Sequence, residues 1–168
     1  MVASADEEFS EFMQGRWSQL VRLGYALSGD LQTAEDLAQT AFARAYASWW
    51  RVRRADNPDA YVRRIVVNAN RNRFRKPRVS ELLTESLPEL SVPADGVSQR
   101  DDRAVLVQEL MRLSPGQRAA VVLRYWLDLS EAETAALLGC SVGNVKSQAA
   151  RGLAKLRASA ALLEGGLL

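Results

Sequence analysis

The sequence predicts an all-α protein with two small helical domains, joined by a flexible acidic linker, the second containing a helix-turn-helix. Apolar residues recur at three- and four-residue spacing almost throughout, and no stretch alternates between apolar and polar residues as a strand would. Prolines and acidic residues gather in residues 77–98, where no packed core is expected. We therefore expect one domain over residues 5–76 and a second over residues 99–162.

The first domain begins with two amphipathic helices, expected over residues 6–27 and 33–51. The first is apolar at Phe9 and at further positions near helical spacing, and Gly29 ends it. The second has a continuous apolar stripe that ends at Trp49, so this tryptophan is expected in the core. The apolar positions of this stripe are Ala34, Leu37, Ala38, Ala41, Phe42, Ala45 and Trp49.

A third helix is expected to start at Asn57 and to run to about Lys76. The Asn57 side chain can accept a hydrogen bond from a free N–H group at the helix start, and Pro58 suits the first helical position. Pro77 ends the segment, because proline cannot continue the backbone hydrogen bonding of a helix.

The second domain contains two capping boxes that mark helix starts. Ser114 is followed three residues later by Gln117, and Ser130 is followed by Glu133. In this pattern the hydroxyl and the longer side chain satisfy each other's backbone N–H groups. Another helix is expected before Ser114, and a last long helix is expected to begin at Ser141.

Residues 130–157 have the spacing of a helix-turn-helix. Ala135 is small where two helices approach closely, and Gly139 suits the left-handed turn that follows. Val145 is placed to pack the second helix onto the first. The rest of the expected buried face consists of Leu137, Leu138, Val142, Ala149, Leu153 and Leu156.

The composition excludes several classes of chemistry. Of the 168 residues, none is histidine, which rules out Ser-His-Asp and Cys-His catalysis and His-ligated zinc sites. No glycine-rich phosphate loop occurs either. Metal-dependent chemistry on carboxylates is not excluded by composition. For the function assigned below we expect no cofactor or metal of the protein's own and no catalytic residues.

The apolar runs and the single cysteine indicate a cytoplasmic location. No apolar run approaches the roughly 20 residues that cross a bilayer, and the N-terminal residues lack the pattern of a secretory signal, so no membrane insertion is expected. Cys140 is the sole cysteine, so no intrachain disulfide can form, which fits a reducing cytoplasm. Its simplest role is that of a small buried side chain.

The net charge of +2 conceals strong segregation of charge along the chain. Residues 49–76 carry nine basic and two acidic residues, and residues 141–157 carry four basic residues and no acidic one. Residues 77–102 carry six acidic and two basic residues. Two basic patches indicate a polyanion contacted in two places; the alternative is that both are ordinary solvated faces.

The expected third helix carries a basic and amide stripe. Arg64, Asn68, Arg71 and Arg75 lie at i, i+4, i+7 and i+11, on one face of the helix. Asparagine is a poor helix former, so its frequency here favours hydrogen bonding to bases or to the sugar–phosphate backbone. The basic side chains on this face repel one another unless an anion such as DNA lies along the helix.

An aromatic and basic group precedes this helix. Trp50 is adjacent to a cluster of arginines, and aromatics beside arginines form stacking platforms for unpaired bases. The pattern leaves open whether Trp50 stacks on bases or packs in the core. The arginines are Arg51, Arg53 and Arg54.

The second helix of the helix-turn-helix has the polarity of a recognition helix. Amides and hydroxyls lie near its start, where base edges are read, and basic residues follow, where phosphates are met. The alternative is an ordinary helical hairpin with a solvated basic face. The candidate contact residues are Ser141, Gly143, Asn144, Lys146, Ser147, Gln148, Arg151 and Lys155.

Four motifs then give the chain a family resemblance. They are AEDLAQTAFARAY at residues 34–46, YVRRIVVN at 61–68, LSPGQR at 113–118 and VGNVKS at 142–147. From about residue 9 to residue 156 the chain resembles bacterial RNA polymerase sigma factors of the extracytoplasmic-function type.

This resemblance implies a partner and a role for each segment. The helix around residues 36–46 would bind the clamp of core RNA polymerase through Asp36, Gln39 and Arg44. Residues 51–75 would capture unpaired bases of the promoter −10 element, so that binding energy drives strand separation without covalent chemistry. The helix-turn-helix would bind −35 duplex DNA, and an anti-sigma factor is the family's usual regulator.

Gln148 departs from the family pattern, in which many members carry arginine. Glutamine is uncharged and pairs well with adenine in the major groove, so Gln148 is expected either to weaken phosphate attraction or to shift −35 readout toward adenine.

Two other functions compete with this interpretation. A stand-alone dimeric helix-turn-helix regulator would need a symmetric operator, and it leaves the stripe on the third helix unexplained. A nucleic-acid-processing enzyme would need a carboxylate cluster for metal, whereas the acidic residues lie mainly at the N-terminus and in the linker.

Overall fold

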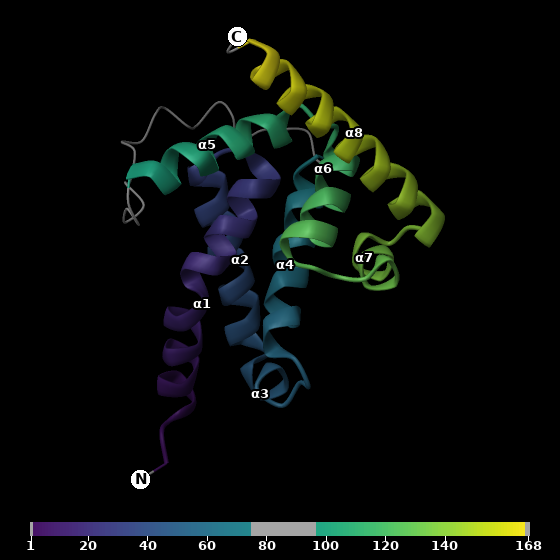
Figure 1. Ribbon diagram of the computed structural model, residues 1–168. Helices are drawn as coiled ribbons and strands as arrows, with labels where there is room; N and C mark the ends of the chain where they lie inside the picture. Colours follow the sequence, from purple (N-terminus) through teal and green to yellow (C-terminus); the bar gives the residue numbers. More distant parts are fainter. Residues whose placement is uncertain (1, 75–96, 167–168) are drawn as a thin grey trace.

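The computed structural model describes residues 2–74 and 97–166, and every regular element in these ranges is helical, which confirms the all-α prediction. Figure 1 shows α1, α2 and α4 running alongside one another, with α5 crossing one end of them and α7 and α8 to one side. No helix in the described ranges is long and apolar enough to cross a membrane. The elements are α1 (Ala5–Ser28), α2 (Leu31–Ala47), α3 (Trp49–Val52), α4 (Pro58–Arg73), α5 (Val97–Met111), α6 (Pro115–Val121), the π-helical η2 (Val122–Trp126), α7 (Glu131–Leu138) and α8 (Val142–Gly166).

The first half is a bundle of α1, α2 and α4. Each of the three helices contacts the other two. Close approach of α1 and α2 requires Gly24, because a Cβ there would lie 2.9 Å from the Cα of Ala34. Gly29 ends α1 in the left-handed conformation at φ 72°, where glycine has no steric penalty.

The apolar stripe of α2 is buried as predicted, but the helix ends earlier than expected. All seven stripe residues are buried, Trp49 included. The predicted end at residue 51 is wrong: α2 stops at Ala47, because Ser48 leaves the helical conformation at φ −121° and ψ 29°. The chain then turns into the short α3, which leaves Trp50 61% exposed while Trp49 packs against Phe9 and Phe12.

In the second half, both capping boxes are present and the helix-turn-helix is formed by α7 and α8. Gly139 is left-handed at φ 67°, and Val145 is fully buried. Val142 is a correction: it is 39% exposed, because it is the first residue of α8 and precedes the turn that packs on α7. Cys140 is likewise half-buried rather than fully buried.

The two halves share one hydrophobic core. Leu27 and Val67 belong to the same cluster of buried side chains as Leu113 and Val122. Helix α1 contacts α5 and α6, and α4 contacts α7.

Part of the expected linker, and residues 75 and 76 of the expected third helix, lie outside the described residues, and α4 ends at Arg73. The residues outside are 75–96, which include Arg75. Residues 97 and 98, expected in the linker, belong to α5.

Candidate polymerase and nucleic-acid interfaces

Helix α2 presents a polar face opposite its buried stripe. Asp36, Gln39 and Arg44 are all exposed on it, and the Asp36 carboxylate accepts a hydrogen bond of 3.2 Å from the Gln32 side chain. Tyr46 is also exposed near the end of this helix. Its hydroxyl donates to the Asp6 carboxylate at 2.7 Å, which raises the pKa of Tyr46 because the negative charge stabilises the protonated phenol.

The expected stacking platform lies at α3 and the residue that follows it. The guanidinium carbon of Arg51 lies 5.1 Å from the ring centre of exposed Trp50, within range of a cation–π contact. Arg53 pairs with Glu8 at 3.2 Å, which ties the end of α3 to α1. Arg54 is exposed beside them.

The residues of the basic and amide stripe on α4 differ in how far they are exposed to solvent. Arg64 is exposed, whereas Asn68 and Arg71 are half-buried. Nη1 of Arg71 donates a hydrogen bond to the backbone carbonyl of Leu138, at the end of α7, while its buried Nε has no hydrogen-bond partner within residues 2–74 and 97–166. Arg75, the last member of the stripe, is outside the described residues.

The start of α8 is fixed by Ser141. Its hydroxyl accepts from the backbone N–H of Asn144 at 3.1 Å, which caps one of the free amides in the first turn of the helix. Gly143, Asn144 and Arg151 are exposed, while Ser147 and Gln148 are half-buried.

Two lysines of α8 are engaged within the second half. Nζ of Lys146 lies 3.6 Å from a carboxylate oxygen of Glu131, and Nζ of Lys155 donates to the side-chain oxygen of Gln117 at 2.9 Å. Both lysines are exposed, so a phosphate could displace these partners at little cost.

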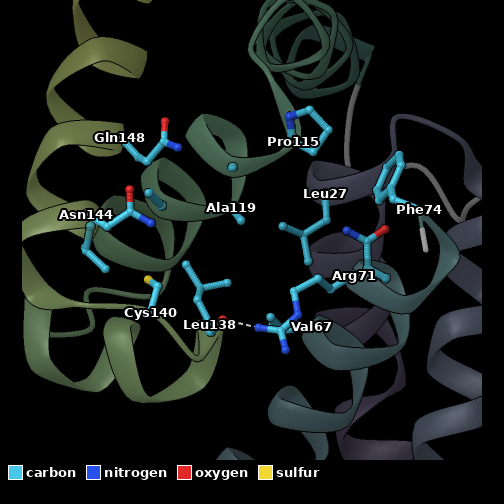
Figure 2. A pocket seen from close by; sticks show the side chains of 14 residues that line it. Leu27, Val67, Arg71, Phe74, Pro115, Ala119, Leu138, Cys140, Asn144 and Gln148 are labelled. Atoms are coloured by element: carbon cyan, nitrogen blue, oxygen red, sulfur yellow. Dashed lines mark hydrogen bonds between the residues drawn. The ribbon is translucent and has the colours of Figure 1, made fainter.

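A cavity of about 260 Å³ lies between α4 on one side and α6, α7 and α8 on the other. Figure 2 shows the side chains of Asn144 and Gln148 on one wall and that of Arg71 on the opposite wall. Asn70, which is buried, and Cys140 also line this cavity. The structure thus brings candidate −35 residues and a candidate −10 residue to one space.

Arg118 is the residue whose importance sequence reasoning missed. It is 7% exposed, and its guanidinium donates to the carbonyls of Leu110, Leu113 and Leu27 at 2.9, 3.0 and 3.1 Å. Burial lowers the pKa of Arg118, and the charge of Arg73 acts in the same direction. The available signal was spacing: Arg118 lies three and four residues before buried Val121 and Val122, on the same helix face.

The acidic side chains are dispersed. Within residues 2–74 and 97–166 no group of three or more Asp, Glu or Cys side chains is placed to hold a metal ion. The candidate surfaces described above consist of arginine, lysine, amide and aromatic groups.

Comparisons with known proteins match two segments of the chain. The family model for sigma-70 region 2 matches residues 17–79, and that for sigma-70 region 4 matches residues 103–156. The RNA polymerase sigma-E factor of Streptomyces coelicolor is 43% identical over 150 residues, covering 89% of this chain and 84% of that protein. The ECF RNA polymerase sigma factor SigM of Mycobacterium tuberculosis is 33% identical over 155 residues, covering 92% of this chain and 78% of that protein.

A solved structure gives the same relationship at the level of the fold. The sigma factor RpoE of Bartonella quintana, crystallised with the anti-sigma factor NepR, superposes with a TM-score of 0.66 at 25% identity. The match covers 89% of this chain and 94% of that chain. The chain belongs to the extracytoplasmic-function sigma factors, which direct core RNA polymerase to specific promoters by binding −35 duplex DNA and opening the −10 element.

Proposed function

We propose that this sigma factor assigns its three tasks to three separate surfaces. The polar face of α2, with Asp36, Gln39 and Arg44, binds core RNA polymerase. The observation that carries this assignment is that these side chains are exposed while the opposite stripe of the same helix is fully buried. Because the apolar side of this helix is already buried in the domain's own core, its exposed polar side is accessible to a partner.

The −10 surface consists of α3, the loop after it and α4. Trp50 stacked with Arg51 provides a platform for an unpaired base, and Arg53, Arg54 and Arg64 provide positive charge for the strand's phosphates. Asn68, Arg71 and Arg75 extend this surface along α4. Strand opening follows from binding, because each captured base offsets the few kcal/mol that its unstacking costs.

The −35 surface is the first half of α8. Asn144 and Gln148 are placed one helical turn apart, as base-reading side chains in a major groove require. Lys146, Arg151 and Lys155 meet phosphates, and Ser141, Gly143 and Ser147 lie close enough to the helix start to approach the DNA backbone.

The remaining expectations complete the proposal. The chain catalyses no covalent reaction and acts in the cytoplasm, with its functional units at residues 5–76 and 99–162 joined by the acidic segment that precedes α5. An anti-sigma factor regulates it; the Bartonella quintana structure shows a related sigma factor with such a partner.

The test is transcription from genomic fragments by core RNA polymerase with and without the purified chain, followed by sequencing of the run-off transcripts. Transcripts that begin downstream of a shared −35/−10 pattern, and only with both proteins present, are the expected result. The exposed Arg64→Ala should reduce these transcripts, while Arg112→Ala, an exposed arginine outside the three surfaces, should not. If the chain instead binds a palindromic duplex by itself and never associates with polymerase, the assignment is wrong.

Gln148 sets part of the −35 preference. Gln148→Ala is expected to change the preferred −35 sequence at one position in a promoter library, by about 1–3 kcal/mol of discrimination. An unchanged preference across the library would exclude base readout by this side chain.

A further inference from the structure

We propose that the cavity between α4 and helices α6, α7 and α8 binds a small organic carboxylate with an apolar body, of about ten non-hydrogen atoms in all. This inference goes beyond promoter recognition, because such a ligand binds the chain without DNA or polymerase. It follows from three properties of the cavity: the positive charge at its wall, its apolar lining and its volume.

The charge at the cavity wall comes from Arg71. Among the described residues that line the cavity, Arg71 carries the one charged side chain, and none is acidic. Its Nη1 is bonded to the Leu138 carbonyl, while its enclosed Nε has no acceptor in the part of the chain that the structure describes. A neutral carbonyl does not balance the charge of the guanidinium, so an anion beside this side chain is favourable.

A second guanidinium lies behind the wall of the cavity. Arg118 is buried and donates to the backbone carbonyl of Leu27, and Leu27 is one of the residues that line the cavity. Two cations near one small space, with no carboxylate among its described lining residues, create a positive potential that attracts anions. The electrostatics therefore favour a negatively charged ligand over a neutral one of the same shape.

Most of the lining is apolar. Leu27, Val67, Leu138 and Val145 contribute aliphatic side chains, and Phe74 contributes an aromatic ring (Figure 2). Apolar ligand atoms that leave water for such walls gain a hydrophobic contribution that an inorganic anion does not have. An organic anion therefore matches this cavity better than phosphate or chloride does.

The volume limits the size of the ligand. A protein cavity of about 150 Å³ accommodates benzene, so the volume of about 260 Å³ here accommodates roughly ten non-hydrogen atoms. A nucleotide or a long-chain fatty acid is about twice too large by the same measure. Asn144 and Gln148 lie on the wall opposite Arg71 (Figure 2), where their amides can bond a polar group at the far end of a ligand. Phenylacetate, a carboxylate joined to one aromatic ring, is a probe of this size.

The test titrates the purified chain with phenylacetate by isothermal calorimetry, without DNA or polymerase. Phenylacetamide is the matched control for charge, because it has nearly the same shape and is neutral. Acetate is the matched control for the apolar body. Cys140, the single cysteine, lines the cavity and serves as a local reporter, because a bound ligand shields its thiol from alkylation by iodoacetamide.

Phenylacetate is expected to bind one site per chain with a Kd of about 0.1–1 mM, as suits a ligand of this size. At about four times the Kd it should slow alkylation of Cys140 about fivefold, because alkylation then needs the roughly one site in five that is empty. Phenylacetamide should bind at least about tenfold more weakly, since it lacks the charge that pairs with Arg71. Acetate at the same concentration should leave the alkylation rate unchanged.

Two variants locate the ligand. Arg71→Gln keeps a donor for the Leu138 carbonyl but removes the charge, so it should weaken phenylacetate binding at least about tenfold. Ala119→Leu fills part of the cavity and should weaken binding to a similar extent with Arg71 in place. Arg112→Gln, at an exposed arginine that does not line the cavity, should keep the Kd within about twofold of the parent's. Circular dichroism melts identify any variant that is not folded, and the comparison of phenylacetate with phenylacetamide on the parent chain needs no variant.

Several results would overturn the inference. Equal affinities for phenylacetate and phenylacetamide would mean that the cavity does not select an anion. Unchanged binding in folded Arg71→Gln, or binding that leaves Cys140 unshielded, would place the ligand outside the cavity. Neither heat nor shielding up to about 10 mM phenylacetate would exclude a site of this class. These readouts involve no promoter, so their failure leaves the proposed function intact, and failure of the transcription test leaves the ligand site intact.

Discussion

Replacing Arg118 with methionine removes the donor of three hydrogen bonds of 2.9 to 3.1 Å and of a longer one, 3.4 Å, to the Met111 carbonyl. The side chain is 7% exposed, and the bonds to Leu110, Leu113 and Leu27 are 2.9 to 3.1 Å long, so water cannot easily replace them. Each bond contributes about 1 kcal/mol net after the cost of dehydrating the charge, which gives about 3 kcal/mol for Arg118→Met. For a chain of this size, that loss lowers Tm by about 6–12 °C.

Urea unfolding followed by circular dichroism measures this loss directly. Arg112→Met is the matched control, because that side chain is 69% exposed and its loss should change stability by less than about 0.5 kcal/mol. A loss below about 1 kcal/mol for Arg118→Met would refute the reasoning, since the carbonyls would then have found other donors.

Three further predictions concern packing, titration and polymerase binding. Gly24→Ala should destabilise the protein by about 1–3 kcal/mol, because its Cβ would press on the Ala34 backbone. Gly15→Ala, whose Cβ would have nothing within 4 Å, should stabilise it by about 0.5–1 kcal/mol. Urea unfolding of both variants should therefore give changes of opposite sign. Hydrogen bonds to Ser130 lower the pKa of Glu133, so the ionised carboxylate stabilises the folded protein fully above the ordinary carboxyl pKa and loses this effect as pH falls through the folded-state pKa. Between about pH 5 and pH 3 the urea midpoint of Glu133→Gln should therefore fall less than that of the parent chain. Parallel curves for the two proteins would contradict this. Arg44→Glu should weaken core polymerase binding by about tenfold or more in a pull-down titration while the melting curve stays within about 0.5 kcal/mol of the parent's, and undiminished binding would remove this side chain from the interface.

Local pattern was enough to predict most of the secondary structure. The capping boxes at Ser114 and Ser130 and the left-handed Gly139 depend on residues three to five positions apart, so the sequence shows both partners of each interaction. The break at Ser48 was missed because the apolar stripe continues through it to Trp49, and periodicity alone does not register a single non-helical residue.

The candidate surfaces were predicted unevenly for a related reason. Exposure of Asp36 and Arg44 follows from helical periodicity, since both lie opposite the buried stripe. The orientation of Arg71 does not, because its acceptor on Leu138 is 67 positions away along the chain. Likewise nothing local indicates that Arg118 reaches Leu27. Helical periodicity describes one helix at a time, so it could not predict contacts between the two halves.

The joint between the halves distributes mutational risk unequally. Arg118 and Arg71 donate to the backbone carbonyls of Leu27 and Leu138, respectively, and every amino acid that could replace those leucines brings the same carbonyl. The acceptor side of each contact is thus insensitive to substitution as such, while the donor side depends on the one residue type that combines a rigid fork of N–H groups with permanent charge. Among the four residues of these two contacts, substitution is therefore expected to remove the hydrogen bonds at Arg71 and Arg118 rather than at the leucines that accept them.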